Sequence, residues 1–335
     1  MKKRYLFLLL ILLSIIPIFL YYGKDRTVSK EQAIEKCSLP NSQFLQWKGM
    51  DIHYVEYGEK GNEQVLTLHG LGGSVHNFKA LNQMLSDEYY VVAVDLPGFA
   101  LSDVPDMTLF GEGQFMEVYR QFIQFIIEEF DLNDFHIIGN SMGGWISWET
   151  ASVHPDKIKS LTLSASAGYE MEEVAKVATG WLSNRNVRRF INRGLPMSLL
   201  KMNVHNKIFY DKNKINEDEI AINYFLFNKE GTIDWILDLA ASGTPADTAK
   251  IPAIEVPSLI IWGDKDKIVP VEHAAKFHRD LPNSHKIIYE NCGHVPQIEM
   301  AERFKADFVE FVTNLEIEEE EEILEEFSEE ETEEV

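Results

Sequence analysis

Residues 135–145 contain the pattern in this chain that is most typical of nucleophilic chemistry. The segment reads FHIIGNSMGGW, an apolar run followed by Gly139, Ser141 and Gly143 at alternate positions. A serine flanked in this way is typical of a tight strand-to-helix turn, where a larger side chain two residues before or after it would clash. The following helix would offer backbone N–H groups to a developing negative charge. We therefore predict that Ser141 is a nucleophile rather than an inert serine in a glycine-rich turn.

A serine nucleophile requires a general base and a carboxylate that orients the base. Of the ten histidines, His294 is the best placed, because it follows an apolar run and Gly293 in IIYENCGHV. Asp264 and Asp266 both follow the apolar run of SLIIWGDKDKIVP, which gives the chain order serine, aspartate, histidine that such a site uses. We predict that Asp266 is the orienting acid, since it comes just before the turn at residues 268–270, and that Asp264 braces the loop.

The segment LTLHGLGGS at residues 66–74 ends an apolar run with glycines that let the backbone approach a substrate. We predict that the backbone N–H groups of Leu71 and Met142 form an oxyanion hole. His69 is assigned to hydrogen bonding within the loop rather than to catalysis. Together these residues predict hydrolysis of an acyl group through a covalent intermediate on Ser141, with no cofactor and no metal ion.

Short apolar runs alternate with helical patterns along most of the chain, which predicts an α/β fold with a mostly parallel central sheet flanked by helices. The predicted buried strands are residues 65–68, 91–94, 135–138, 160–163, 259–262 and 287–289. Alternating apolar residues at 44–58 predict an antiparallel hairpin, and residues 29–36 predict a helix. The core then comprises residues 43–167 and 252–315. The roughly 80 residues at 168–251 exceed an ordinary connection and are predicted to form an inserted helical cap.

Residues 1–23 begin with basic side chains and continue with an uncharged apolar run of 18 residues. Such a run approximately spans the hydrocarbon core of a bilayer, and no Ala-x-Ala-like cleavage site follows it. We predict a single-pass membrane anchor, joined to the core by residues 24–42. The catalytic domain is expected on the extracytoplasmic side, and secretion after signal cleavage is the alternative.

The net charge of −23 is concentrated near the C-terminal end, where residues 316–335 contain thirteen glutamates and no basic residue. This acidic tail is predicted to be disordered, because like charges repel one another. The negative charge of the whole chain argues against nucleic acid as a partner, since binding phosphates requires clustered lysine and arginine.

Cys37 and Cys292 are the only cysteines. Their spacing matches no zinc motif. We predict two free thiols, with one disulfide as the alternative if the domain lies outside the cytoplasm.

In these motifs the sequence resembles the α/β-hydrolase superfamily, and within it the membrane-anchored monoacylglycerol lipase-like members and their bacterial lipase relatives. The resemblance covers about residues 44–312 and rests on HGLGG, VDLPGF, GNSMGG, IIWGDKDKIVP and ENCGH in family order. It implies an α/β-hydrolase fold with an inserted helical cap, and Asp266 as the catalytic acid by position. Ser141 separates the chain from relatives resembling haloalkane dehalogenases or epoxide hydrolases, whose nucleophile is a carboxylate.

The favoured function is a serine esterase or lipase acting on monoacylglycerols or other medium- and long-chain acyl esters. An anchor would hold the site beside the membrane, and a cap can shield an acyl chain. One alternative is a carbon–carbon bond hydrolase of meta-cleavage type, which shares the triad. Another is a membrane-tethered binding module without activity. The basic residues within 181–202 could lie on anionic lipid or form a solvated face of the cap.

Overall fold

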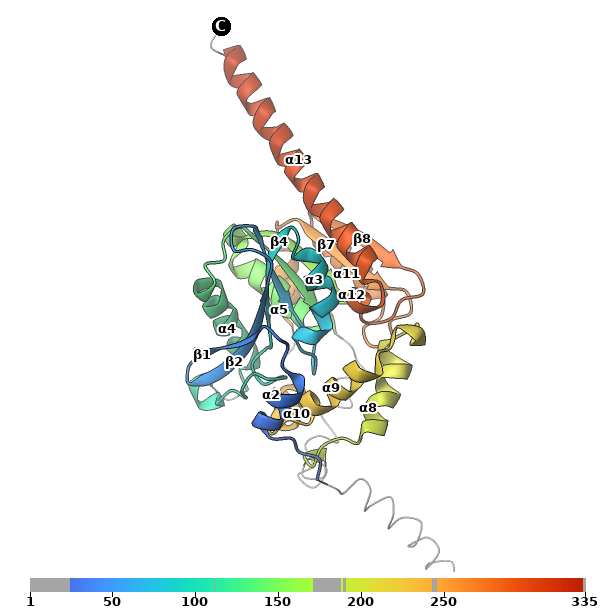
Figure 1. Ribbon diagram of the computed structural model, residues 1–335. Coiled ribbons are helices and arrows are strands. Elements are labelled where there is room, and N and C mark those ends of the chain that lie inside the picture. Colours follow the sequence, from blue (N-terminus) through green and yellow to red (C-terminus); the bar gives the residue numbers. More distant parts are fainter. Residues whose placement is uncertain (1–24, 112, 171–187, 189–190, 243–245, 334–335) are drawn as a thin grey trace, which may run out of the picture.

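The computed structural model describes residues 25–333, except 112, 171–187, 189–190 and 243–245. At its centre is an eight-stranded sheet in the order β1-β2-β4-β3-β5-β6-β7-β8 (Figure 1). β2 is antiparallel to both β1 and β4, and all other neighbours are parallel. The strands are β1 (Ser42–Trp47), β2 (Met50–Tyr57), β3 (Glu63–Leu68), β4 (Tyr89–Val94), β5 (Phe135–Asn140), β6 (Ile158–Ser164), β7 (Ser258–Gly263) and β8 (Ser284–Tyr289).

Consecutive residues of the inner strands pack on opposite faces of the sheet. Ile137 and Ile260 belong to the larger apolar cluster, whereas the next residues, Ile138 and Ile261, belong to the smaller one. Because both faces are covered, these strands are apolar at successive positions instead of alternating with polar residues. The predicted hairpin and the six predicted strands are confirmed, although Ile287 and Ile288 of β8, at the edge of the sheet, are only partly buried.

Helices cover both faces of the sheet. Side chains of α4 (Phe115–Glu129), α5 (Met142–Val153) and α11 (Glu272–Asp280) enter the larger cluster. Side chains of α3 (Lys79–Leu85) and α13 (Ala301–Glu333) enter the smaller one. Short elements connect them: η1 (Val75–Phe78), η2 (Met107–Leu109), η3 (Pro155–Lys157), η6 (Thr248–Ala253) and α12 (Pro296–Glu299). The predicted α/β class is therefore confirmed.

The described part of residues 168–251 is helical and lies at one end of the sheet (Figure 1). Its elements are α8 (Met197–Asn203), the π-helix η4 (Val204–Ile208), η5 (Lys212–Lys214), α9 (Glu217–Phe227) and α10 (Thr232–Ser242). The predicted N-terminal helix, α2 (Lys30–Cys37), is confirmed and packs beside α9, and Val28 pairs with Lys229 in an isolated bridge. The segment before the first strand is thus attached to the cap.

Two basic residues of segment 181–202, which was predicted to face lipid or solvent, form ion pairs within the cap. Arg188 Nη2 lies 2.5 Å from Asp238 Oδ1, and Lys201 pairs with Glu217. Arg185 and Arg189 lie outside the described residues. These partners favour a role for Arg188 and Lys201 in holding cap elements together.

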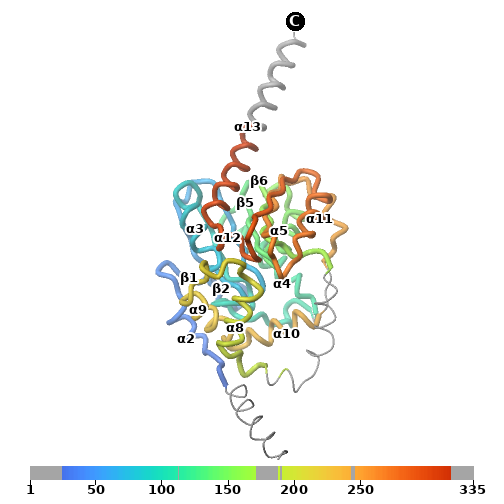
Figure 2. Tube along the Cα trace, turned by 90° about the vertical axis from the view of Figure 1, so that its right-hand side faces the viewer, coloured from blue at the N-terminus to red at the C-terminus, as the bar shows by residue number. Residues whose placement is uncertain are grey.

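α13 is helical from the core to Glu333. It leaves the body on the side away from the cap (Figures 1 and 2). Phe304 and Phe308 anchor its first turns in the core, and Glu316 Oε1 lies 3.0 Å from Lys159 Nζ. Glutamate is a good helix former, and adding residues to an existing helix is far easier than starting one. A packed beginning therefore propagates the helix into the acidic tail.

Among the described residues, no helix is both long enough and apolar enough to span a membrane. The predicted anchor at residues 1–23 lies outside them. Cys37 and Cys292 are free, as predicted. Both are buried, and burial raises the pKa of the Cys37 thiol to about 12.

Candidate active site

Ser141 occupies the turn between β5 and α5 with backbone angles of φ 56° and ψ −115°. A positive φ is costly for a residue with a side chain, so neighbouring structure must hold the turn in place. The Ser141 N–H donates to Ser164 O at 3.0 Å, and Ser141 O accepts from the Ala167 N–H at 2.8 Å. The turn is therefore fastened to the end of β6 and the loop beyond it.

Gly139 and Gly143 are required by crowding around this turn. A Cβ atom on Gly139 would lie 2.3 Å from Ser147 Oγ, and one on Gly143 would lie 2.2 Å from Leu68 O. Side-chain carbons do not approach other atoms so closely, so a larger residue at either position would displace the backbone. The predicted need for small residues on both sides of the serine is confirmed.

His294 and Asp266 are hydrogen-bonded to each other. His294 Nδ1 lies 2.8 Å from Asp266 Oδ2, and the Asp266 side chain is fully buried. Asp266 Oδ1 accepts from the N–H groups of Ile268 and Val269 at 2.7 and 3.0 Å. A carboxylate held in this way accepts a hydrogen bond from the Nδ1–H group, which leaves His294 Nε2 unprotonated and able to take up a proton.

Asp264 has different partners. Its Oδ2 lies 2.6 Å from Lys265 Nζ, and the side chain is 25% exposed. Burial would raise the pKa of Asp264, but Lys265 and the backbone N–H groups of Asn291 and Cys292 lower it overall. Asp264 therefore pairs with its neighbour Lys265, while Asp266 is the aspartate that reaches the histidine.

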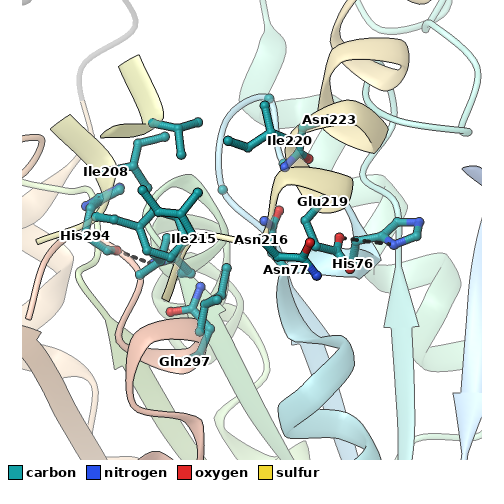
Figure 3. A pocket seen from close by; sticks show the side chains of 18 of the residues that line it. His76, Asn77, Ile208, Ile215, Asn216, Glu219, Ile220, Asn223, His294 and Gln297 are labelled. Carbon is teal, nitrogen blue, oxygen red and sulfur yellow. Dashed lines mark hydrogen bonds and ion pairs between the residues drawn. The ribbon is translucent and has the colours of Figure 1, made fainter. Parts of the chain in front are cut away.

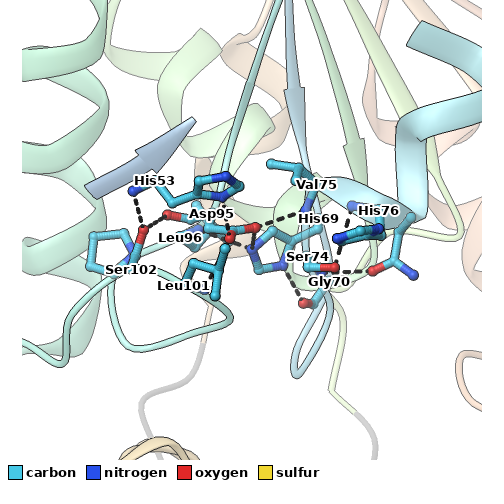
Figure 4. A network of polar contacts seen from close by, with 12 residues as sticks. His53, His69, Gly70, Ser74, Val75, His76, Asp95, Leu96, Leu101 and Ser102 are labelled. Atoms are coloured by element: carbon cyan, nitrogen blue, oxygen red, sulfur yellow. Dashed lines mark hydrogen bonds and ion pairs between the residues drawn. The ribbon is translucent and has the colours of Figure 1, made fainter. Parts of the chain in front are cut away.

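His69 braces the glycine-containing loop from inside the core. Its Nδ1 donates to Gly70 O at 2.8 Å, and its Nε2 accepts from the Leu96 N–H at 2.9 Å (Figure 4). Burial lowers the pKa of His69, so the ring is neutral at neutral pH. Both ring nitrogens are engaged, which agrees with a bracing role.

Asp95, just after β4, is the centre of a buried network that holds the same loop (Figure 4). Its Oδ1 accepts from the Val75 N–H at 2.8 Å, and its Oδ2 accepts from the Leu101 N–H at 3.0 Å and lies 2.7 Å from His53 Nδ1. Burial alone would raise the pKa of Asp95, but the His53 ring, its hydrogen bond, His69 and the Val75 N–H together lower it. The network joins the loop to β2 and β4.

The loop lies close to Ser141 at Gly70. A Cβ atom on Gly70 would lie 3.0 Å from Ser141 Cβ. Leu71 comes next in the loop, and Met142 is the first residue of α5. Within the described part of the chain, neither of their N–H groups donates a hydrogen bond. Both donors are available to an oxygen atom of a ligand.

A cavity of about 410 Å³ lies between the core and the cap, and both Ser141 and His294 line it (Figure 3). Apolar side chains from the cap and α12 form much of its wall: Val204, Ile208, Phe209, Ile215, Ile220 and Ile298. Polar side chains gather on the side away from His294 in Figure 3: His76, Asn77, Asn216, Glu219 and Asn223. No cluster suited to a metal ion occurs among the described residues.

Ser141 and His294 share this cavity, although no hydrogen bond joins their side chains in the described structure. Asn140 connects their backbones, because its Nδ2 donates to Ser164 O at 3.0 Å and to His294 O at 3.2 Å. Catalytic hydrogen bonds are often loose without substrate and tighten when it binds. The arrangement therefore suits activation of the serine by the histidine.

A model of the alpha/beta hydrolase fold matches residues 64–301, which is most of the chain. The chain belongs to this family. The matched region extends from β3 through α12 and includes Ser141, Asp266 and His294. The α/β-hydrolase fold predicted from the sequence is confirmed.

Relatives of this α/β hydrolase include enzymes named for different reactions. The chain is 28% identical over 277 residues to Lipase 1 of Psychrobacter immobilis, covering 80% of this chain and 82% of that protein. It is 26% identical over 271 residues to a 2-hydroxy-6-oxononadienedioate/2-hydroxy-6-oxononatrienedioate hydrolase of Cupriavidus pinatubonensis, covering 78% and 91%. A crystal structure of a bacterial membrane phospholipase A shares the fold with a TM-score of 0.67 and 23% identity, covering 94% of this chain and 99% of that one.

Four further polar residues around the α/β-hydrolase site were given no role in the prediction from the sequence. Asn140 and Asp95 lie inside the recognised segments GNSMGG and VDLPGF, so their positions were visible but their partners were not. Gln297 and Glu299 lie in α12, just after His294, and are only 1% and 2% exposed. The short segment PQIE mixes apolar and polar residues, so the sequence carried no signal that these two side chains are buried.

Proposed function

We propose that this hydrolase cleaves carboxylic esters through an acyl-enzyme on Ser141. The observation that carries the proposal is the Asp266–His294 hydrogen bond, made at the wall of the cavity that Ser141 also lines. The positive φ of Ser141 supports it further, because an inert serine would not need a strained backbone.

In the proposed reaction, Ser141 Oγ attacks the acyl carbon while His294 Nε2 takes the serine proton. Asp266 stays ionised and stabilises the imidazolium, and the N–H groups of Leu71 and Met142 donate to the oxyanion. His294 then protonates the departing alkoxide, which leaves as the alcohol. A water molecule that gives its proton to His294 attacks the acyl-enzyme, and the serine recovers its proton as the carboxylic acid departs.

The proposed substrates are lipid esters, such as monoacylglycerols or other medium- and long-chain acyl esters. The apolar side chains that the cap contributes to the cavity suit an acyl chain. The similarity to Lipase 1 of Psychrobacter immobilis supports the same class.

A second candidate is hydrolysis of a carbon–carbon bond in a vinylogous diketone produced by ring fission. It is favoured by the 26% identity to the Cupriavidus pinatubonensis hydrolase, whose name describes such a substrate. The same serine, histidine and aspartate would serve either reaction, so substrate turnover must separate them.

Two measurements test these proposals. A fluorophosphonate probe should label the protein, and Ser141→Ala should abolish the labelling. The purified protein should then cleave p-nitrophenyl esters of graded chain length faster than it cleaves a ring-fission diketone. Labelling without ester cleavage would favour the carbon–carbon hydrolase, and well-folded protein that is never labelled would favour a binding module.

We further propose that residues 1–23 anchor the enzyme in a membrane with the catalytic domain on the extracytoplasmic side. The proposal rests on the 18-residue uncharged apolar run. The full chain should sediment with membranes and resist extraction by alkaline carbonate, and external protease should reach its catalytic domain. A soluble product lacking these residues would support secretion after cleavage.

A further inference from the structure

Glu299 is a buried carboxylate that the proposed reaction does not use. It is the last residue of α12, five residues after His294, and is 2% exposed. Its recorded partners among the described residues are backbone N–H groups and the Cys292 thiol, and no lysine or arginine forms an ion pair with it. Burying a carboxylate without a cation costs free energy, and the hydrogen bonds that Glu299 accepts must offset that cost.

The two oxygens of Glu299 face different parts of the molecule. Oε1 accepts from the Gly293 N–H at 2.7 Å, in the loop that carries His294. Oε2 accepts from the N–H groups of Tyr210 and Asp211 at 3.0 and 2.9 Å, in the cap. One side chain therefore joins two backbone segments about eighty residues apart in the chain.

A second contact joins the same segments directly. The His294 N–H donates to Ile208 O at 2.8 Å, and Ile208 lies beside His294 at the cavity wall (Figure 3). A Cβ atom on Gly293 would lie 2.3 Å from Ile208 O and 2.8 Å from Tyr210 N. The cap backbone is thus packed against the histidine loop at a point where only glycine fits.

We propose that Glu299 is a positioning residue that locks the cap segment 208–211 onto the loop carrying His294. The general base and the cap wall of the acyl cavity are then held as one unit. This inference rests on the proposed function, because it assigns His294 the role of base.

Glu299→Gln is the sharpest test, since it keeps the shape of the side chain. An amide has one acceptor oxygen, so its NH2 group must face an N–H donor at one of the two segments. We expect kcat on p-nitrophenyl acetate to fall about tenfold, because small misplacements of a catalytic group are costly. KM for p-nitrophenyl decanoate should rise several-fold while KM for the acetate stays unchanged, since only the longer ester needs the cap wall.

The matched control is Glu302→Gln, which removes the same charge from an exposed position three residues further on. It should leave both esters unaffected. Assays at 25 °C, well below the measured Tm of each variant, separate positioning from stability: a purely structural role would lower Tm and leave kcat and KM unchanged.

Hydrogen–deuterium exchange provides a readout that does not depend on activity. In Glu299→Gln, peptides covering residues 206–213 and 290–297 should exchange faster together, whereas peptides from β5 should not change. Glu299→Gln that keeps wild-type kcat, KM and exchange would overturn this inference alone. Wild-type protein that cleaves neither ester and resists the fluorophosphonate probe would overturn the proposed function and this inference with it.

Discussion

Asp266 Oδ2 lies 2.8 Å from His294 Nδ1, whereas Asp264, two residues earlier, pairs with Lys265. The two aspartates are neighbours in the chain, but their side chains have different partners. Asp266→Asn should lower kcat roughly 10³- to 10⁴-fold, because an amide can present its NH2 group to Nδ1 and favour the wrong tautomer. Asp264→Asn is the matched control and should cost less than tenfold. Steady-state kinetics of both variants checks this, and the reverse order would contradict the assignment of Asp266.

Gly143→Ala should disrupt the nucleophile turn, because its Cβ atom would meet Leu68 O at 2.2 Å. We expect a loss of roughly 1–3 kcal/mol in the free energy of unfolding from overpacking, together with loss of fluorophosphonate labelling. Gly49→Ala is the control, since a Cβ atom there meets no atom within 4 Å and only the φ of 81° is unfavourable. Chemical denaturation compares the two, and an equal effect at both glycines would argue against crowding at the turn.

Asp95→Asn should destabilise the protein in a pH-dependent manner. The folded-state pKa of Asp95 is lowered to about 2, so its contribution to stability is fully present above the ordinary carboxyl pKa of about 4 and is lost as the pH falls through about 2. We therefore expect the difference in unfolding free energy between wild type and Asp95→Asn to shrink from pH 7 to pH 3. Denaturation at several pH values measures this difference. The exposed Asp87→Asn should change stability by less than about 0.5 kcal/mol throughout.

Ile215→Trp should shorten the acyl chain that the enzyme accepts, because Ile215 belongs to the apolar cavity wall beside His294 (Figure 3). We expect kcat/KM for p-nitrophenyl decanoate to fall at least about tenfold, the effect of a few lost methylene contacts, while the acetate is little affected. Ile317→Trp, at a position that is 49% exposed on α13, is the control. Equal losses on both esters would show that this wall does not hold the acyl chain.

The sequence by itself predicted the strands and the turn at Ser141, because both depend on local patterns. A buried parallel strand needs successive apolar residues, and a strained turn needs glycines at fixed distances from the serine. The α/β fold and the chain order of Ser141, Asp266 and His294 follow from those patterns. The structure then showed Asp266 in contact with His294, as the turn after Asp266 had indicated.

The tertiary structure decided what depends on segments far apart in the chain. Nothing near Glu299 in the sequence shows that its second oxygen meets Tyr210 and Asp211, because that contact forms only when the cap packs on the core. The start of α13 was likewise set by tertiary packing, because Phe304 and Phe308 lie in the core. Local rules describe how a segment folds against its near neighbours, whereas packing determines which distant segments become neighbours.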